Sequence, residues 1–230
     1  MGWTVALMCY NEEATLAEAT RRTVRVMRRL GLPYEILIVD DGSRDASARV
    51  ATDLAAEFPE IRLIAHKRNR GVGAVLGTSY REARGDFVVA LPADLQMAPE
   101  DLPAAMRLMP DADVVEILRL KRQDRWLRKV VSLVDRTLTG MLFGVWNRDL
   151  HWVKLYRRAF LQDVQMTCRT PVADTEVLIQ ARERGARVVQ VTLPHHPRRR
   201  GRSRAAGLVG VVISAVELLW LWVRSRRGKI

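Results

Sequence analysis

The chain has 230 residues, a hydrophobic content of 48% and a formal net charge of +12 at pH 7. This size and apolar content suit one large domain with a substantial core. Two cysteines, Cys9 and Cys168, are too few for a disulfide framework and favour a reducing compartment. The positive charge calls for an anionic partner, which leaves nucleic acid, anionic lipid and phosphorylated substrates as candidates.

Strand-type and helix-type segments alternate through the first half of the chain. The spacing of apolar residues predicts strands over 3–9, 36–39, 61–65 and 87–91, and helices over 12–30, 45–57 and 72–83. Strands and helices that repeat at this spacing form a mostly parallel sheet with helices on both faces. The sequence therefore predicts an α/β fold.

Two acids end the second predicted strand. In EILIVDDGSRD, over 35–45, a short apolar run leads directly into Asp40 and Asp41. Ligands of open α/β folds bind beyond the carboxyl ends of the strands, and these carboxylates could accept hydrogen bonds from a base or a ribose. The alternative is a plain strand-to-turn transition with Asp, Gly and Ser in the turn.

Two further segments suit a nucleotide. MCYNEE, over 8–13, places Tyr10, Asn11 and Glu12 after the first strand, where an aromatic ring and a carboxylate can stack on and bind a nucleobase. NRGVGAVLG, over 69–77, places Gly71 and Gly73 at a helix start, where free backbone N–H groups favour phosphate. By itself the glycine signal is weak, because glycines are common in loops.

Oxygen ligands follow the fourth predicted strand. LPADLQMAPE, over 91–100, contains Asp94 and Gln96. Two oxygen donors at this spacing suit Mg²⁺ or Mn²⁺ bridging a diphosphate.

The second half of the chain is less regular. We expect strands over 113–118, 150–156 and 187–193, and helices over 126–145 and 174–184. The helix over 126–145 is amphipathic, and it either packs on the core or contacts a membrane. In ADTEV, over 173–177, Asp174 and Glu176 could serve as a catalytic base or could only complement a helix dipole.

The C-terminal part is basic and then apolar. HHPRRRGRSR, over 195–204, supplies cationic donors beside a glycine, and 205–223 is nineteen mostly apolar residues long. That length is just adequate for a membrane span, but Glu217 would be costly near the bilayer centre. The sequence favours a helix that lies in the interface or packs on the protein over one that spans.

These segments, taken in order, resemble glycosyltransferase family 2 with the GT-A fold. YNEE, VDDGSRD, NRGVGAVLG, ADLQ and RRRGRSR carry the resemblance, which runs over about residues 3–204. The subgroup that looks most similar is the dolichol- and polyprenol-phosphate sugar transferases. The resemblance implies a catalytic domain over 1–204, and the apolar and basic composition of the remainder predicts a membrane-associated helix with a basic tail over 205–230.

The resemblance also implies roles for individual residues. Asp94 and Gln96 would hold the metal, Mg²⁺ or Mn²⁺, and Asp94, Asp174 and Arg198 would be catalytic. The nucleotide sugar would be bound by Tyr10, Asn11, Glu12, Asp40, Asp41, Asn69, Gly71 and Arg204, and the acceptor phosphate by Arg122, Arg128 and Ser203.

Three positions depart from the family pattern. Pro92 replaces the usual first acid of the D-x-D motif, which removes one charge beside the metal. Met8 stands where a proline is common, and Arg204 replaces a lysine, which keeps the charge but changes the donor geometry.

The expected activity is inverting transfer of a sugar from a GDP- or UDP-sugar to a polyprenyl or dolichyl phosphate. The expected place is the cytoplasmic face of the membrane, with peripheral attachment and without nucleic acid as a partner. The alternatives are transfer to a saccharide or another glycolipid, and a non-catalytic basic protein that binds a nucleotide or nucleic acid.

Overall fold

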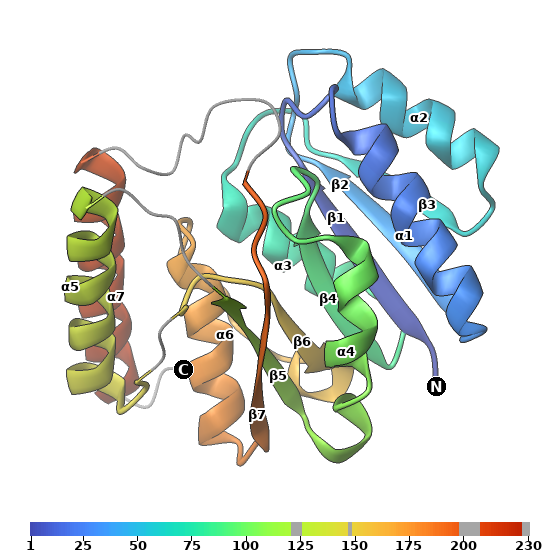
Figure 1. The fold of residues 1–230 in the computed structure, drawn as a ribbon. Helices are drawn as coiled ribbons and strands as arrows, with labels where there is room; N and C mark the ends of the chain where they lie inside the picture. Colours follow the sequence, from blue (N-terminus) through green and yellow to red (C-terminus); the bar gives the residue numbers. More distant parts are fainter. Residues whose placement is uncertain (121–125, 147–148, 198–207, 227–230) are drawn as a thin grey trace.

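A single seven-stranded sheet forms the centre of the molecule (Figure 1). The computed structural model describes residues 1–120, 126–146, 149–197 and 208–226, without the side chains of 126–131, 134 and 208–211. The strands are β1 (Trp3–Cys9), β2 (Tyr34–Asp40), β3 (Ile61–Ala65), β4 (Phe87–Pro92), β5 (Val114–Leu120), β6 (Lys154–Arg157) and β7 (Val188–Pro194).

Helices follow most of these strands. The longer ones are α1 (Leu16–Leu30), α2 (Ser47–Glu57), α3 (Val72–Glu82), α5 (Trp126–Phe143), α6 (Val172–Glu183) and α7 (Leu208–Arg226). The short α4 (Leu102–Met106) lies between the 3₁₀ turns η1 (Pro99–Asp101) and η2 (Met109–Asp111), and the 3₁₀ turn η3 (Arg158–Phe160) follows β6.

The sheet is mostly parallel, as the sequence predicts. Its order is β3-β2-β1-β4-β6-β5-β7, and only β6 runs antiparallel to its neighbours, β4 and β5. A parallel pair needs a crossover connection, and α1, α2 and α3 supply those crossovers in the first half of the chain.

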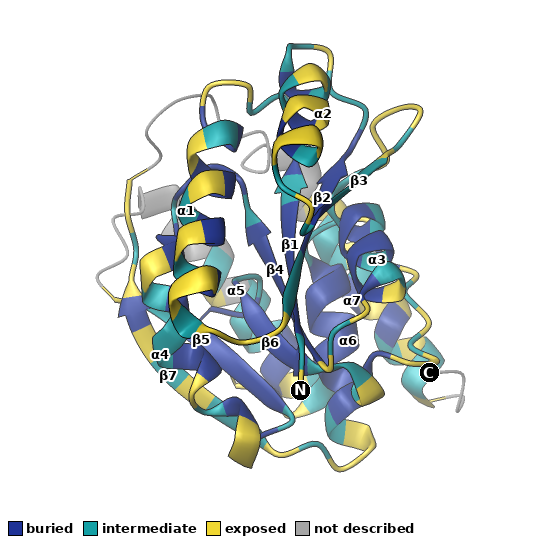
Figure 2. Cartoon of the chain, turned by 90° about the vertical axis from the view of Figure 1, so that its right-hand side faces the viewer, coloured by how far each residue is buried: buried dark blue, intermediate teal, exposed yellow. Residues whose placement is uncertain are grey.

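Alternate residues of each central strand pack on opposite faces of the sheet. Val5 and Leu7 of β1 pack toward α1, α2 and α4, whereas Ala6 between them packs toward α3 and α6. Both faces are therefore covered, which is why these strands are almost continuously apolar. Figure 2 shows the central strands β1 and β4 mostly dark and the outer sides of α1 and α2 exposed.

Helices α5 and α7 lie side by side at one end of the molecule, beyond α6 (Figure 1). Several of their large apolar side chains are exposed: Leu133, Met141, Val212, Ile213, Val216, Leu219, Trp220 and Val223. We call this set the α5–α7 apolar surface. None of the helices in the described ranges combines the length and the apolarity that a membrane span requires.

Two elements begin four residues later than predicted, at 16 instead of 12 and at 154 instead of 150. The helix expected from residue 12 begins at Leu16, because residues 11–15 form a turn in which the Glu12 carbonyl accepts from the Thr15 and Leu16 amides. The strand expected over 150–156 is shortened to Lys154–Arg157, because the Trp152 amide donates back to the Asp149 carbonyl and closes a turn there.

Candidate functional site

Three loops begin side by side at the carboxyl edge of the sheet. The register pairs Cys9 with Asp40 and Met8 with Pro92, so β1, β2 and β4 end at the same level. The Asp41 amide donates to the Cys9 carbonyl at 2.9 Å, and the Ala93 amide donates to the Met8 carbonyl at 3.0 Å. The acids after β2 and β4 therefore share one edge, where open α/β folds bind their ligands.

Asp41 organises the loop that precedes α3. Asp41 is 2% exposed, and its carboxylate accepts from the backbone amides of Arg70, at 3.0 Å, and Gly71, at 2.8 Å. It also lies 2.6 Å from Nδ1 of His66, whose Nε2 lies 2.9 Å from the Thr78 hydroxyl. Asp41 is thus placed at the predicted nucleotide end, where its carboxylate supports the loop.

The loops after β1 and β2 interlock. Asp40 accepts from the hydroxyl and the amide of Ser43, and the same hydroxyl accepts from the Asn11 amide at 2.9 Å. The Asn11 side chain in turn accepts from the Arg44 amide at 2.8 Å, and Asn11 has a positive φ of 54°. Asn11 and Asp40, both predicted to bind the nucleotide, therefore belong to two loops that hydrogen bonds hold together.

Tyr10, Glu12 and Asn69 complete this edge of the sheet. The Glu12 amide donates to the Ser47 hydroxyl at 2.9 Å, and its carboxylate accepts from the Thr15 hydroxyl at 3.2 Å. Tyr10 and Glu12 are half-buried, and Asn69 is exposed. The assignment of these residues to nucleotide binding stays a prediction.

The amides of the two glycines at the start of α3 are already used. The Gly71 amide donates to Asp41 at 2.8 Å, and the Gly73 amide donates to the Arg169 carbonyl at 3.1 Å. The expectation of free N–H groups for a phosphate is therefore wrong for these two residues. Their role in the structure is to hold the loop between Asp41 and the segment before α6.

Asp94 and Gln96 lie on the loop after β4. The Asp94 carboxylate accepts from the Gln96 amide at 3.0 Å, and burial raises the pKa of this carboxyl above its ordinary value. The Gln96 carbonyl accepts from the His196 amide at 2.9 Å, which connects the end of β7 to the same loop. Among the described residues, no three His, Cys, Asp or Glu side chains gather as a metal cluster.

Asp174 does not lie open to a substrate, contrary to its predicted role as a base. It is buried in the first turn of α6, where it forms an ion pair with Lys154 of β6. The hydroxyls of Tyr80 and Tyr156 also donate to it, at 3.0 and 3.1 Å. Burial and the neighbouring Asp174 charge raise the pKa of both phenols, which keeps them protonated donors.

Glu176, the other predicted candidate base, is fully buried. It accepts from the Thr167 and Cys168 amides at 2.8 and 3.0 Å. Both carboxylates of ADTEV are therefore buried and engaged in hydrogen bonds within the protein. The sequence did not predict the contacts of Lys154, Tyr80 and His66 with buried acids. Their partners lie 20, 94 and 25 residues away along the chain.

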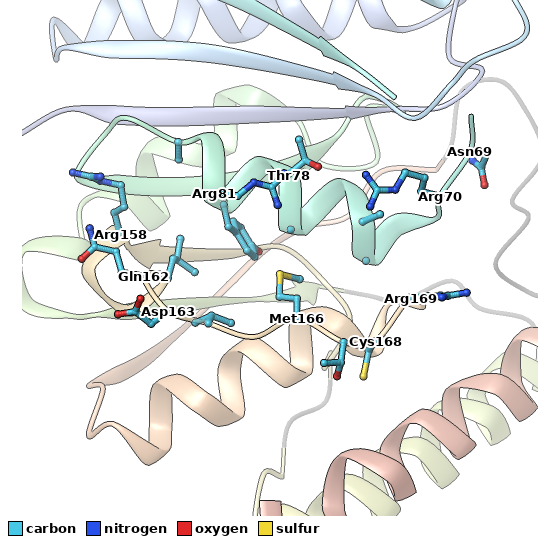
Figure 3. A pocket seen from close by; sticks show the side chains of 18 of the residues that line it. Asn69, Arg70, Thr78, Arg81, Arg158, Gln162, Asp163, Met166, Cys168 and Arg169 are labelled. Atoms are coloured by element: carbon cyan, nitrogen blue, oxygen red, sulfur yellow. The ribbon is translucent and has the colours of Figure 1, made fainter. Parts of the chain in front are cut away.

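A groove of about 1310 Å³ runs along α3, between this helix and the segment before α6. Asn69 and Arg70 lie at one end, and Gln162 and Asp163 lie toward the other (Figure 3). Its lining includes five arginines, which gives it positive character: Arg68, Arg70, Arg81, Arg158 and Arg169.

Several predicted residues lie outside the described part of the chain. They are Arg122, Arg198, Ser203 and Arg204. Arg128 belongs to α5, but its side chain is not described. The boundary predicted at 204 falls within the same undescribed stretch.

The sequence matches a family model and several curated proteins. The model described as "Glycosyl transferase family 2" matches residues 4–164. The undecaprenyl-phosphate 4-deoxy-4-formamido-L-arabinose transferase of Sodalis glossinidius is 36% identical over 87% of the chain, and the one from Pseudomonas fluorescens is 33% identical over 89%. The chain spans only 61% and 60% of the length of these relatives.

Solved structures show the same fold. Glucosyl-3-phosphoglycerate synthase from Mycobacterium tuberculosis, in complex with Mn²⁺, UDP and phosphoglyceric acid, has a TM-score of 0.76 and 21% sequence identity. The match covers 96% of this chain and 78% of that one. The same enzyme with UDP gives a TM-score of 0.74 at 20% identity, over 96% of this chain and 80% of that one.

Proposed function

The chain belongs to glycosyl transferase family 2 and has the GT-A fold, and from this premise we propose that it transfers a sugar from a nucleotide sugar to a polyprenyl phosphate. The observation that carries the proposal is the shared edge of β1, β2 and β4. The buried residues Asp40, Asp41 and Asp94 lie at or just beyond the ends of β2 and β4 on this edge. The relatives named as undecaprenyl-phosphate sugar transferases support the choice of acceptor.

Asp94 and Gln96 would hold a divalent metal together with the donor diphosphate. Carboxylate and amide oxygens are the hard donors that Mg²⁺ and Mn²⁺ prefer, and Mg²⁺ is commonly bound by one or two carboxylates plus substrate phosphates. With proline at position 92, Asp94 is the one acid of the motif, so the diphosphate would have to complete the ligand set. When bound, the ion would stabilise the charge that develops on the leaving diphosphate.

The buried state of Asp174 and Glu176 favours a phosphate acceptor over a hydroxyl acceptor. A sugar hydroxyl needs a base to take its proton during attack. A phosphate monoester has a second pKa near about 6 and is already largely ionised at neutral pH. Since the two carboxylates that the sequence offered as bases are engaged in structural hydrogen bonds, an acceptor that needs no base suits this site.

The α5–α7 apolar surface would bring the enzyme to its lipid substrate. Exposed leucine, valine and tryptophan side chains on this surface can enter the interfacial layer of a bilayer. Arg224 and Arg226 stack on the rings of Trp220 and Trp222 at 4.8 and 5.3 Å, which places cationic groups beside the aromatic ones. We propose peripheral attachment to the cytoplasmic face of the membrane.

The proposal is tested with purified protein, Mn²⁺ or Mg²⁺, a panel of UDP- and GDP-sugars and a short-chain polyprenyl phosphate. We expect release of nucleoside diphosphate that depends on the lipid phosphate and on one donor. Asp94→Asn removes the only acid of the metal motif and should lower turnover at least about a hundredfold. Arg49→Gln, an exposed change on α2, is the matched control.

Two results would contradict the proposal. Release that occurs equally with a sugar or a glycolipid in place of the lipid phosphate would assign the acceptor to another class. Unchanged turnover in Asp94→Asn would remove this residue from the metal site.

A further inference from the structure

Helix α7 turns Ser214, Glu217 and two buried leucines, Leu218 and Leu221, toward the protein, and its exposed apolar side chains point outward. Ser214 and Glu217 contact Thr170, and Ser225 donates to Glu183 of α6 at 3.2 Å. Val216, by contrast, is 59% exposed. The single acid of this apolar helix therefore serves a contact with the catalytic domain.

Glu217 accepts hydrogen bonds from the turn that leads into α6. Its two carboxylate oxygens accept from the Arg169 amide at 2.8 Å, the Thr170 amide at 3.2 Å and the Thr170 hydroxyl at 2.6 Å. Hydrogen bonds to an ionised carboxylate are stronger than neutral ones. The negative charge also lies near the N-terminus of α6, where the helix dipole favours it.

A second carboxylate holds the residues just before this turn. Glu176 accepts from the Thr167 and Cys168 amides, so four successive backbone N–H groups, 167 to 170, are held by two carboxylates. Glu176 belongs to α6 itself, whereas Glu217 comes from a different helix. The position of this segment consequently depends on how α7 is docked.

The segment over 167–170 lies directly against the start of α3. The Arg169 carbonyl accepts from the Gly73 amide at 3.1 Å. A Cβ added at Gly73 would lie 2.3 Å from the Cys168 carbonyl oxygen and 2.9 Å from the Arg169 Cα. With no space between the two backbones, a shift of the segment displaces the start of α3.

The start of α3 is in turn tied to the nucleotide end of the site. The Gly71 and Arg70 amides donate to Asp41, and Asp41 follows directly on β2. A continuous path of hydrogen bonds and close contacts therefore runs from α7, through Glu217, the 167–170 segment and Gly73, to Asp41.

We infer that Glu217 is a positioning residue for the donor site: it fixes the 167–170 segment against α3 and thereby fixes the loop that Asp41 holds. This inference rests on the proposed function only in taking the loop to be part of the nucleotide site. It connects the helix that carries the α5–α7 apolar surface to the end of the sheet where the donor would bind.

The full chain is compared with Glu217→Ala, Glu217→Gln and Ser225→Ala. Ser225→Ala is the matched control, because it removes a hydrogen bond between α7 and α6 without touching the 167–170 segment. Amide hydrogen exchange at Gly71 and Gly73 is the first readout, and the Kd for UDP and GDP with Mn²⁺ is the second.

In Glu217→Ala we expect faster exchange at Gly71 and Gly73 and nucleotide binding weakened by roughly tenfold. Glu217→Gln keeps one acceptor oxygen, so its exchange rates and its nucleotide Kd should lie between those of Glu217→Ala and the wild type. Ser225→Ala should match the wild type in both readouts.

Two outcomes would overturn the inference. One is a Glu217→Ala protein whose exchange changes only within 167–170 while Gly71, Gly73 and the nucleotide Kd stay at wild-type values. The other is an equal loss in Ser225→Ala, which would indicate general loosening of α7. If the wild type transferred no sugar, the proposed function would be wrong. The amide exchange of Gly71 and Gly73 in Glu217→Ala would still show whether Glu217 positions this loop.

Discussion

Three carboxylates, those of Asp41, Glu176 and Glu217, each accept hydrogen bonds from two consecutive backbone amides. Loops that surround a site carry many N–H groups without partners in regular secondary structure, and a buried unpaired N–H is costly. A carboxylate satisfies two such groups at once and fixes the direction of the chain. Acidic side chains in this protein thus shape the loops around the site.

The buried pair of Lys154 and Asp174 gives a stability prediction. The two side chains are 1% and 9% exposed, so removing the lysine leaves a buried carboxylate without its counter-charge. We expect Lys154→Met to lower the free energy of unfolding by about 3–5 kcal/mol, measured by urea denaturation. Adding Asp174→Leu to Lys154→Met should recover much of this loss. A double variant no more stable than the single one would show that the tyrosine hydrogen bonds matter more than the ion pair.

The two thiols should be unreactive in the folded protein. Burial raises the pKa of Cys9 to about 12 and also raises the pKa of Cys168, so neither forms appreciable thiolate at pH 8. A colorimetric thiol reagent at pH 8 should label both cysteines in denaturant and neither, within minutes, in the native state. Rapid native labelling of either residue would contradict this prediction.

At the scale of elements, two glycines of α3 differ in what a side chain would meet. A Cβ at Gly73 would lie 2.3 Å from the Cys168 carbonyl oxygen, whereas a Cβ at Gly77 would meet only Met166 Sδ, at 3.5 Å. Gly73→Ala should therefore lower the free energy of unfolding by about 1–3 kcal/mol through overpacking. Gly77→Ala should raise it by about 0.5–1 kcal/mol, because alanine is the better helix former. Thermal unfolding of both variants measures these changes. Equal changes in stability would show that the two backbones move apart to accommodate a side chain at position 73.

The elements that could be predicted from sequence are those with local signals. Short apolar runs located β1, β2 and β4 to within two residues, because burial on both faces leaves an unbroken hydrophobic pattern. The short helix α4 was missed, since five residues show no period. The start of α1 was placed too early, because the turn at Asn11 depends on Ser43 and Arg44 of another loop.

The site was predictable in part for the same reason. Strand ends placed Asp40, Asp41 and Asp94 on one edge, and the structure places them there. The burial of Asp174 was not predictable, because it depends on Lys154 and Tyr80, which other strands and helices bring in. In the sequence Glu217 argued against a membrane span, and in the structure it accepts hydrogen bonds that dock α7 on the segment before α6.

At the scale of the whole molecule, the net charge of +12 and the α5–α7 apolar surface together predict binding to anionic vesicles. Replacing Leu219, Trp220 and Val223 by serine should weaken this binding at least about tenfold in co-sedimentation, because apolar area no longer enters the bilayer. Leu32→Ser is the control, as Leu32 is an exposed apolar residue next to α1. Equal binding of the triple variant and the control would rule out this surface as the attachment site.

The antiparallel strand β6 has a consequence for synthesis of the chain. Strands β1 to β4 lie within the first 92 residues, but one edge of β4 pairs only with β6, which begins at residue 154. At about 5–20 residues per second, the 61 residues between the end of β4 and the start of β6 take roughly 3–12 seconds to translate. During this interval the ribosome-bound chain exposes the apolar edge of β4, because the sheet is incomplete. Other chains can pair with an exposed strand edge of this kind. Chaperone capture of nascent chains stalled between residues 92 and 154 is the cellular signature expected of this topology.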